Sequence, residues 1–325
     1  MKISCGIVPS LDSVEQAQLA EQLGYDRAWL YDSPAIYADI WVTMARIADH
    51  TDRIGLGTAV LVPSLRSVIA TASAIATIEG FAPGRLAVGF GTGATARWTL
   101  GKDALTLKET GEFLRQLRGL LNGEVVEVDG EAVQMMQLPQ FVPPRPIDVP
   151  ILLSALGPKG QALTKEVADG IMTVGFGLPD YGWCAQLVVG TVLDAGEALT
   201  SERVKQAAGP WYAIMGHGAW EAGPEFVDGF PGGAEWRAKL ESMRPEGQRH
   251  LEVHEGHATT VTELDRILVD AAGEGIVGMN WIEEPEGIRT KIAEAEAMGT
   301  TEIIYAPSGP DVPRELRAFA EAAGL

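Results

Sequence analysis

The stretch that decides the fold runs from Arg53 to Ala96 and reads RIGLGTAVLVPSLRSVIATASAIATIEGFAPGRLAVGFGTGATA. β-Branched and aliphatic residues fill 54–62 and 86–90, which predicts two strands buried on both faces. Between them, 67–80 carries apolar residues on every side and no charge before Glu79, which predicts a well-covered helix. Two buried strands joined by a helical crossover form a βαβ unit, whose ligand-binding groups lie at the carboxyl ends of its strands.

The rest of the chain repeats this alternation of strand and helix. Predicted strands lie at 3–8, 27–31, 54–62, 86–90, 149–153, 170–176, 211–215 and 301–305. Predicted helices lie at 11–24, 37–49, 67–80, 106–121, 161–167, 181–199, 264–272, 285–298 and 312–323. Asp129-Gly130 predicts a hairpin within 125–136, and the irregular composition from Gly216 to His257 predicts short helices and a functional lid. The alternation favours an eightfold β/α (TIM) barrel over a doubly wound sheet, as one domain over 1–325 with the lid as an insertion.

Composition limits the functional classes. The chain has 325 residues, of which 46% are apolar, enough for one barrel of about 250 residues with insertions. The formal net charge of −19 argues against a nucleic-acid partner, because phosphates are bound by Lys and Arg. Cys5 and Cys184 cannot build a disulfide framework, and no apolar run is long enough to span a membrane. The first residues, MKISCGIVPS, have the pattern of a strand and not of a signal peptide, so we expect a cytoplasmic protein.

Three segments at predicted strand ends offer candidate ligand contacts. GFGTG at 89–93 matches neither GxGxxG nor a Walker A loop, so it fits a tight turn as well as a ligand contact. Arg97 and the tryptophan after it favour the ligand contact. SALGPKG at 154–160 predicts an anion site, because small residues admit a ligand to a helix N-terminus and Lys159 adds a charge. Asp32 ends the second strand, where it either caps a turn or takes part in chemistry.

The histidines are candidates for metal ligands and for substrate contacts. His250 and His254 are four residues apart and His257 follows, but the HExxH motif is absent, so we expect a solvated loop and no metal ion. His217 lies between glycines after the predicted seventh strand, and it is the histidine that we expect to contact the substrate.

Four motifs together carry a family resemblance. They are GTAVLVP at 57–63, APGRLAVGFGTG at 82–93, LLSALGPKG at 152–160 and ADGIM at 168–172. With them, nearly the whole chain resembles the luciferase-like monooxygenase superfamily, the bacterial luciferase barrel. Within it, the chain is most similar to enzymes that use the deazaflavin coenzyme F420, such as methylenetetrahydromethanopterin reductase and glucose-6-phosphate dehydrogenase of that type.

The resemblance implies a flavin-type coenzyme at the C-terminal face of the barrel. It implies a non-proline cis peptide at Ala59–Val60, in a bulge beneath the ring, and a coenzyme phosphate on the loop 155–159. It also places Asp32 near the polar edge of the ring, and it implies a homodimer, for which the helix 37–49 is a candidate interface. The predicted coenzyme-binding residues are Asp32, Ser33, Thr58, Ala59, Val60, Gly91, Thr92, Gly93, Arg97, Ser154, Ala155, Leu156, Gly157, Pro158 and Lys159. The predicted catalytic residues are Asp32 and His217.

Two positions depart from the F420-dependent sugar-phosphate dehydrogenases. Those enzymes carry a histidine directly after the strand-two acid and a glutamate directly after GTG, where this chain has Ser33 and Ala94. Both acid/base groups of sugar oxidation are therefore missing, which favours a reductase or a monooxygenase. An anionic coenzyme tail needs local cations on this acidic protein, and Lys159, Arg66 and Arg97 are the candidates.

The first prediction is an F420-dependent oxidoreductase that transfers hydride between the deazaflavin and a small organic substrate. The alternative is an FMN-dependent monooxygenase that uses oxygen and reduced flavin from a separate reductase. Two further alternatives are a metal-dependent barrel hydrolase built on His250, His254 and His257, and a flavin-binding protein without catalysis.

Overall fold

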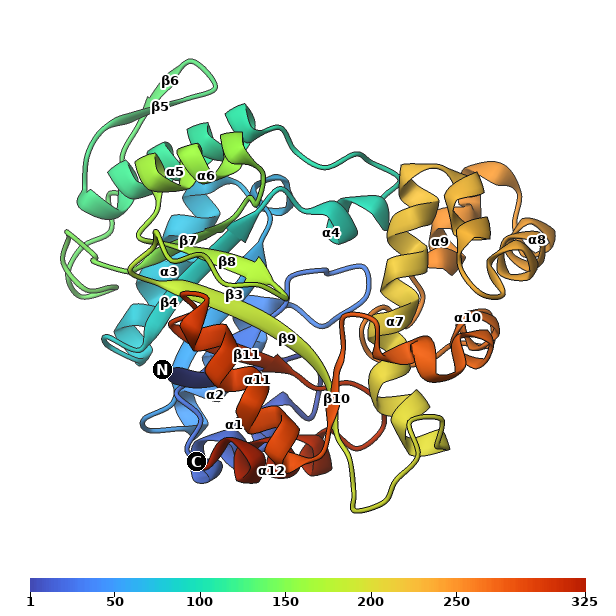
Figure 1. Ribbon diagram of the computed structural model, residues 1–325. Coiled ribbons are helices and arrows are strands. Elements are labelled where there is room, and N and C mark those ends of the chain that lie inside the picture. The colour runs from blue at the N-terminus through green and yellow to red at the C-terminus, as the bar shows by residue number, and fades with distance from the viewer.

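Eight parallel strands close into a barrel in the computed structural model, which describes residues 1–325 (Figure 1). In order around the barrel they are β1 (Lys2–Ile7), β2 (Arg27–Leu30), β3 (Gly55–Leu61), β4 (Leu86–Gly91), β7 (Ile151–Ser154), β8 (Gly170–Val174), β9 (Cys184–Val192) and β11 (Glu302–Ala306). The ring closes because β8 pairs with β9, β9 with β11 and β11 with β1. A ninth strand, β10 (Trp281–Glu283), pairs in parallel with the C-terminal end of β9, from Gly190 to Val192. The predicted eightfold barrel is confirmed.

Helices cover the outside of the barrel. They are α1 (Ser13–Leu23), α2 (Ile40–His50), α3 (Val68–Phe81), α5 (Leu107–Asn122), α6 (Pro158–Val167), α11 (Pro285–Ala297) and α12 (Val312–Ala323), with the short α4 (Ala94–Trp98) after β4. Local sequence sets their ends: α5 begins with a capping box between Thr106 and Glu109 and ends at Gly123, whose φ is +85°. The main apolar core of 46 buried residues includes both strand and helix side chains, such as Leu56 of β3 and Leu114 of α5. None of the helices is long and apolar enough to cross a membrane.

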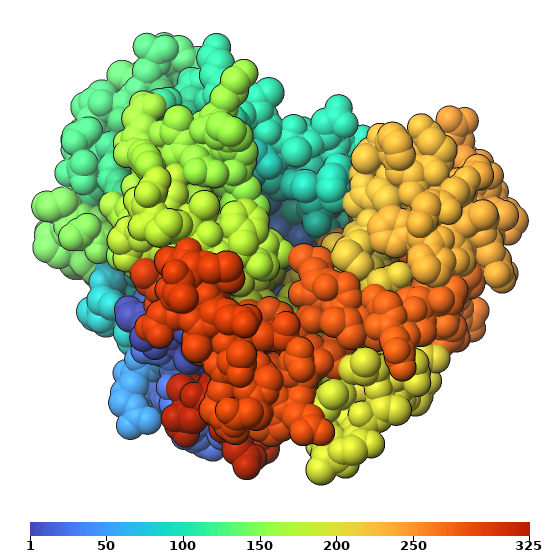
Figure 2. Space-filling model, in the orientation of Figure 1, coloured from blue at the N-terminus to red at the C-terminus, as the bar shows by residue number.

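A second group of helices follows β9 and lies beside the barrel (Figure 1). It consists of α7 (Glu202–Ala222), η2 (Pro224–Gly229), α8 (Gly233–Met243), η3 (Glu246–Gln248), α9 (Arg249–Val253), α10 (Asp265–Ala272) and η4 (Gly273–Val277). We call residues 202–277 the lid cluster. Its helices pack on a separate core of 12 buried residues that includes Trp236, Leu240 and Leu268. Figure 2 shows a hollow in the surface between this group and the 90–105 region of the barrel.

Two of the predicted elements are wrong and several are right. The predicted helix 181–199 is mostly strand β9, and the predicted strand 211–215 lies inside helix α7. The irregular segment predicted at 216–257 falls within the lid cluster, which begins earlier because α7 begins at Glu202. The hairpin is confirmed as β5 (Val126–Val128) and β6 (Glu131–Val133), with Asp129 and Gly130 both at positive φ, as a tight two-residue turn requires.

Candidate functional site

A cavity of about 370 Å³ opens at the carboxyl ends of the barrel strands, between the barrel and the lid cluster. Most of its lining is apolar, with a few polar groups, which is the composition of a small-molecule site. The barrel contributes Tyr31, Asp32, Ser33, Tyr37, Ala59, Val60, Val62, Gly91, Thr92, Gly93, Ala94, Thr95, Ala96, Ser154, Val174 and Leu187, and the residues from 202 onwards contribute Trp211, Ile214, His257, Ala258 and Met279.

Strand β3 departs from regular pairing at this cavity. The peptide bond between Ala59 and Val60 is cis, as the family resemblance implies. The register between β3 and β4 shifts between Thr58 and Leu61, while Thr58 Oγ1 accepts from the Gly89 amide at 2.9 Å and holds the strand just before the bulge. Ala59 and Val60 are half-buried and line the cavity, so the bulge forms part of its wall.

The Gly-rich loop after β4 is packed tightly against this bulge. A Cβ atom at Gly91 would lie 2.7 Å from Val60 Cγ2, and one at Gly93, whose φ is +80°, would lie 2.3 Å from Val62 Cγ1. At both positions a side chain would clash with the bulge, so packing alone accounts for glycine there. Both glycines also line the cavity. Arg97, in the short helix α4 after this loop, donates to Ser64 Oγ at 2.8 Å and to the Asp103 carbonyl oxygen, and it is not among the lining residues.

Asp32 is the buried acid of the site. Its carboxylate accepts a hydrogen bond from Arg66 Nη1 at 2.7 Å, and Arg66 also bridges to Asp39 at 2.8 Å. Burial raises the pKa of Asp32 above its ordinary value of 3.8, although the Arg66 guanidinium opposes the shift. Arg66 is thus neutralised by two carboxylates, and the structure does not present it as a free cation for a coenzyme tail.

The loop after β7 contributes one residue to the cavity and then turns away from it. Ser154 lines the cavity, whereas Gly157, Pro158 and Lys159 are exposed at the start of α6. The N-cap residue of α6 is Gly157, and no side chain caps this end, so the backbone N–H groups of Lys159 and Gly160 are available to a ligand, whereas Pro158 has none. Ala155 is buried, and Leu156 accepts a hydrogen bond from Gln161 at its carbonyl oxygen, 2.8 Å away.

The histidines are arranged differently from the sequence expectation. His254 and His257 are buried and not solvated, and the third histidine beside them is His217 of α7, not His250, which is half-buried. Burial lowers the pKa of His254 and, more strongly, that of His257. Only His257 lines the cavity; His217 lies behind it, with a centroid distance of 5.7 Å between the two rings.

Sequence reasoning missed several lining residues. The Tyr31 hydroxyl and the Trp211 Nε1 are buried at the cavity without a hydrogen-bond partner, which makes them candidates for contact with a ligand. Tyr31 directly follows β2 and precedes Asp32, so its position at a strand end could have predicted a place at the cavity. Trp211 lies in α7 and reaches the cavity through the packing of the lid cluster.

Comparisons with known proteins agree with this architecture. The model of the family described as luciferase-like monooxygenase matches residues 10–302. Over 170 residues the chain is 34% identical to a 5,10-methylenetetrahydromethanopterin reductase of Methanolobus tindarius, covering 50% of each chain. It is 31% identical over 182 residues to an F420-dependent glucose-6-phosphate dehydrogenase of Beutenbergia cavernae, covering 50% of this chain and 52% of the relative. The chain thus spans about half the length of the curated relatives that it matches.

Solved structures match over the whole length. A coenzyme F420-dependent tetrahydromethanopterin reductase from Methanopyrus kandleri superposes with a TM-score of 0.67 at 18% identity, covering 99% of this chain and 98% of the other. An F420-dependent secondary alcohol dehydrogenase, solved with an F420–acetone adduct, gives 0.64 at 19% identity and covers 99% of both chains. At such identities these likenesses establish the fold. With the family model covering residues 10–302, the chain belongs to the luciferase-like monooxygenase family.

Proposed function

We propose that this protein is an oxidoreductase that binds coenzyme F420 in the cavity at the barrel mouth and transfers hydride to or from a small organic substrate. The observation that carries the proposal is the half-buried bulge at Ala59 and Val60, which forms one wall of a mostly apolar cavity of about 370 Å³. The names of the relatives, methylenetetrahydromethanopterin reductase and F420-dependent dehydrogenase, support deazaflavin as the coenzyme.

The residues present fit such a coenzyme. Tyr31 and Trp211 line a mostly apolar cavity, which suits a flat ring. The uncapped start of α6, with Lys159 beside it, suits an anionic tail. When bound, the coenzyme supplies the hydride chemistry.

The chain's own residues then provide orientation and electrostatics. Ala59 and Val60 support the ring from one side, and the Gly91–Gly93 loop fixes the position of that wall. Asp32 lines the cavity with its carboxylate paired to Arg66, and we infer that this acid lies near the polar edge of the bound ring. That His217 contacts the substrate remains a prediction; of the two neighbouring rings, His257 is the one that lines the cavity.

The test is binding of F420 and of FMN, each measured by quenching of tryptophan fluorescence, since Trp211 lines the cavity. We expect F420 to bind more tightly, and Lys159→Ala to weaken it by about ten- to hundredfold, because a charge-assisted hydrogen bond contributes about 1.5–3 kcal/mol. Lys165→Ala is the matched control: Lys165 lies on the same helix but pairs with Asp180 at 3.6 Å, so F420 affinity should not change.

The outcome that contradicts the proposal is tight FMN binding without F420 binding. Oxygenation of a substrate by added reduced FMN under air then identifies the second candidate, an FMN-dependent monooxygenase fed by a separate reductase. The distant fold neighbours include a monooxygenase solved in complex with FMN. The homodimer and the cytoplasmic location stay predictions.

A further inference from the structure

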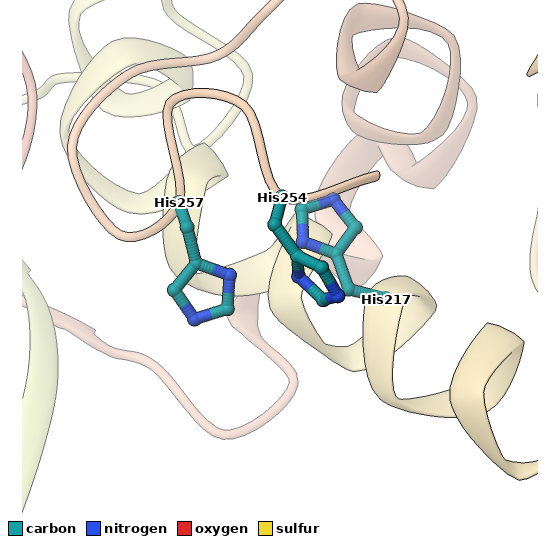
Figure 3. A group of neighbouring side chains, drawn as sticks. All are labelled: His217, His254 and His257. Atoms are coloured by element: carbon teal, nitrogen blue, oxygen red, sulfur yellow. The ribbon is translucent and has the colours of Figure 1, made fainter. Parts of the chain in front are cut away.

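Three buried histidine rings meet at the inner side of the lid cluster. His217 comes from α7, and His254 and His257 come from the turn after α9 (Figure 3). Their exposed fractions are 1%, 2% and 7%, and one ring nitrogen from each lies within 4.8 Å of the others. The rings point toward a common centre from two separate segments, so the packing of the lid cluster creates the group.

The outer nitrogen of each ring has a hydrogen-bond partner. His217 Nε2 lies 2.9 Å from Asp265 Oδ1, His254 Nε2 lies 3.0 Å from Glu221 Oε1, and His257 Nε2 lies 3.2 Å from Thr95 Oγ1. A carboxylate only accepts, so the Nε2 atoms of His217 and His254 carry the hydrogen, and in a neutral ring the Nδ1 atom then keeps its lone pair.

The inner nitrogens have no partner at all. Nδ1 of His217, of His254 and of His257 is buried without a hydrogen bond. One such atom is uncommon in a folded protein, and three in one place indicate a missing occupant. A carboxylate on the far nitrogen is the usual companion of a metal-bound histidine, because it fixes the orientation of the ring and raises its basicity.

We propose that His217, His254 and His257 bind one divalent transition-metal ion of the Zn²⁺ type through their Nδ1 atoms. Imidazole nitrogen suits such ions, and three protein ligands leave a fourth position for water or a substrate atom. Two positive charges from the ion are balanced by Asp265 and Glu221 behind the ligands. Ligand nitrogens on tetrahedral zinc lie about 3.4 Å apart at Zn–N distances of about 2.0–2.1 Å, so small side-chain rotations close the site.

The position suggests what the ion does. It links α7 to the turn that carries His254 and His257, and His257 itself lines the cavity. The ion therefore fixes the position of His257 in the cavity wall and joins two segments of the lid cluster to each other. This inference does not depend on the coenzyme proposal.

The experiment uses the full chain without a histidine tag, stripped with a chelator and dialysed against Zn²⁺. We expect one Zn²⁺ per chain by elemental analysis, and a Co²⁺-loaded protein with the strong visible bands of a four-coordinate site. His217→Ala and His257→Ala should each lose the ion. His250→Ala is the matched control, because His250 is on the same part of the chain but outside the trio, and it should keep the ion.

A second variant tests the outer partners. Asp265→Asn leaves all three ligands in place and should weaken Zn²⁺ binding by about ten- to hundredfold. Circular dichroism checks that each variant is folded; if one is not, the Co²⁺ spectrum of the unaltered chain decides alone. The proposal is overturned if stripped protein takes up no Zn²⁺ at micromolar concentration, in which case a water molecule is the occupant. Uptake that survives loss of the trio overturns it equally.

Discussion

A substitution at Ala59 gives the most direct test of the coenzyme proposal. It lies at the cis peptide in the β3 bulge, is half-buried and faces the cavity. We expect Ala59→Phe to fill the cavity and displace a bound ring, lowering the turnover rate by about a hundredfold, since misplacement by about 1 Å has that effect. Thermal melting without coenzyme should stay close to normal, because the new side chain enters open space.

The matched control for this change is Ala87→Phe in β4. Ala87 is fully buried in the small core inside the barrel, with Trp29 and Leu152, so a phenylalanine there overpacks it and should lower the melting temperature. If Ala59→Phe melts early while its specific activity is intact, Ala59 is a packing residue and not a ring support.

At the scale of elements, the sequence predicted seven of the eight barrel strands near their observed places. Strand β9 was missed because its apolar run is too short for periodicity to separate a strand from a buried helix. Val188, Val189, Thr191 and Val192 are β-branched and were the available signal for a strand. The apolar segment 211–215 was predicted as a strand, yet it lies inside helix α7, which also accommodates Pro210 in its interior.

The start of α7 is held by a charged network around Arg203. This guanidinium donates to Glu197 Oε1 at 2.8 Å, to Glu315 Oε1 at 3.1 Å and to Thr191 Oγ1 at 2.8 Å. The hydrogen bonds from Arg203 lower the pKa of Glu197 from 4.5 to about 2. The network thus ties the first turn of the lid cluster to β9 and α12.

Its contribution to stability depends on pH. Because the folded pKa of Glu197 lies below the unfolded value, the stabilisation is present above about pH 4.5 and is lost as the pH falls toward about 2. We expect Glu197→Gln to lower the free energy of unfolding by about 1–2 kcal/mol at pH 7, and the difference from the unaltered chain to shrink below pH 4.5. Urea denaturation at a series of pH values measures both.

Glu202→Gln provides the comparison. Glu202 pairs with Arg266 on the surface, where both side chains are solvated, so its replacement should change stability little at any pH. A Glu197→Gln effect that is the same at pH 7 and pH 3 contradicts the role of the Glu197 charge.

Over the whole molecule, the elements predicted from the sequence match the structure in the barrel and differ from it in the lid cluster. The strand-end loops were predictable because a parallel barrel brings consecutive βα loops to one face. Asp32, Ala59, Gly91 and Ser154 therefore meet at the cavity as expected. His217 and His254 lie 37 positions apart in segments that only tertiary packing brings together, and no local pattern predicts their meeting.

The two cores predict unequal local stability. The main core buries 46 apolar residues around the barrel, whereas the lid cluster depends on 12. Regions with less buried apolar surface open more readily, so their amide hydrogens exchange faster. Helices α5 and α8 form a matched pair: α5 presents Leu114, Leu117 and Leu120 to the main core, and α8 presents Trp236 and Leu240 to the lid core.

We expect amides of α8 to exchange about tenfold faster than those of α5, or more, when metal and coenzyme are absent. A tenfold difference corresponds to about 1.4 kcal/mol in opening free energy, a small part of the stability of a domain. Hydrogen exchange followed by mass spectrometry of peptides from 107–122 and 233–243 measures it. Equal protection of the two helices would show that lid cluster and barrel unfold as one cooperative unit, in which case the lid core is as stable as the barrel despite its smaller size.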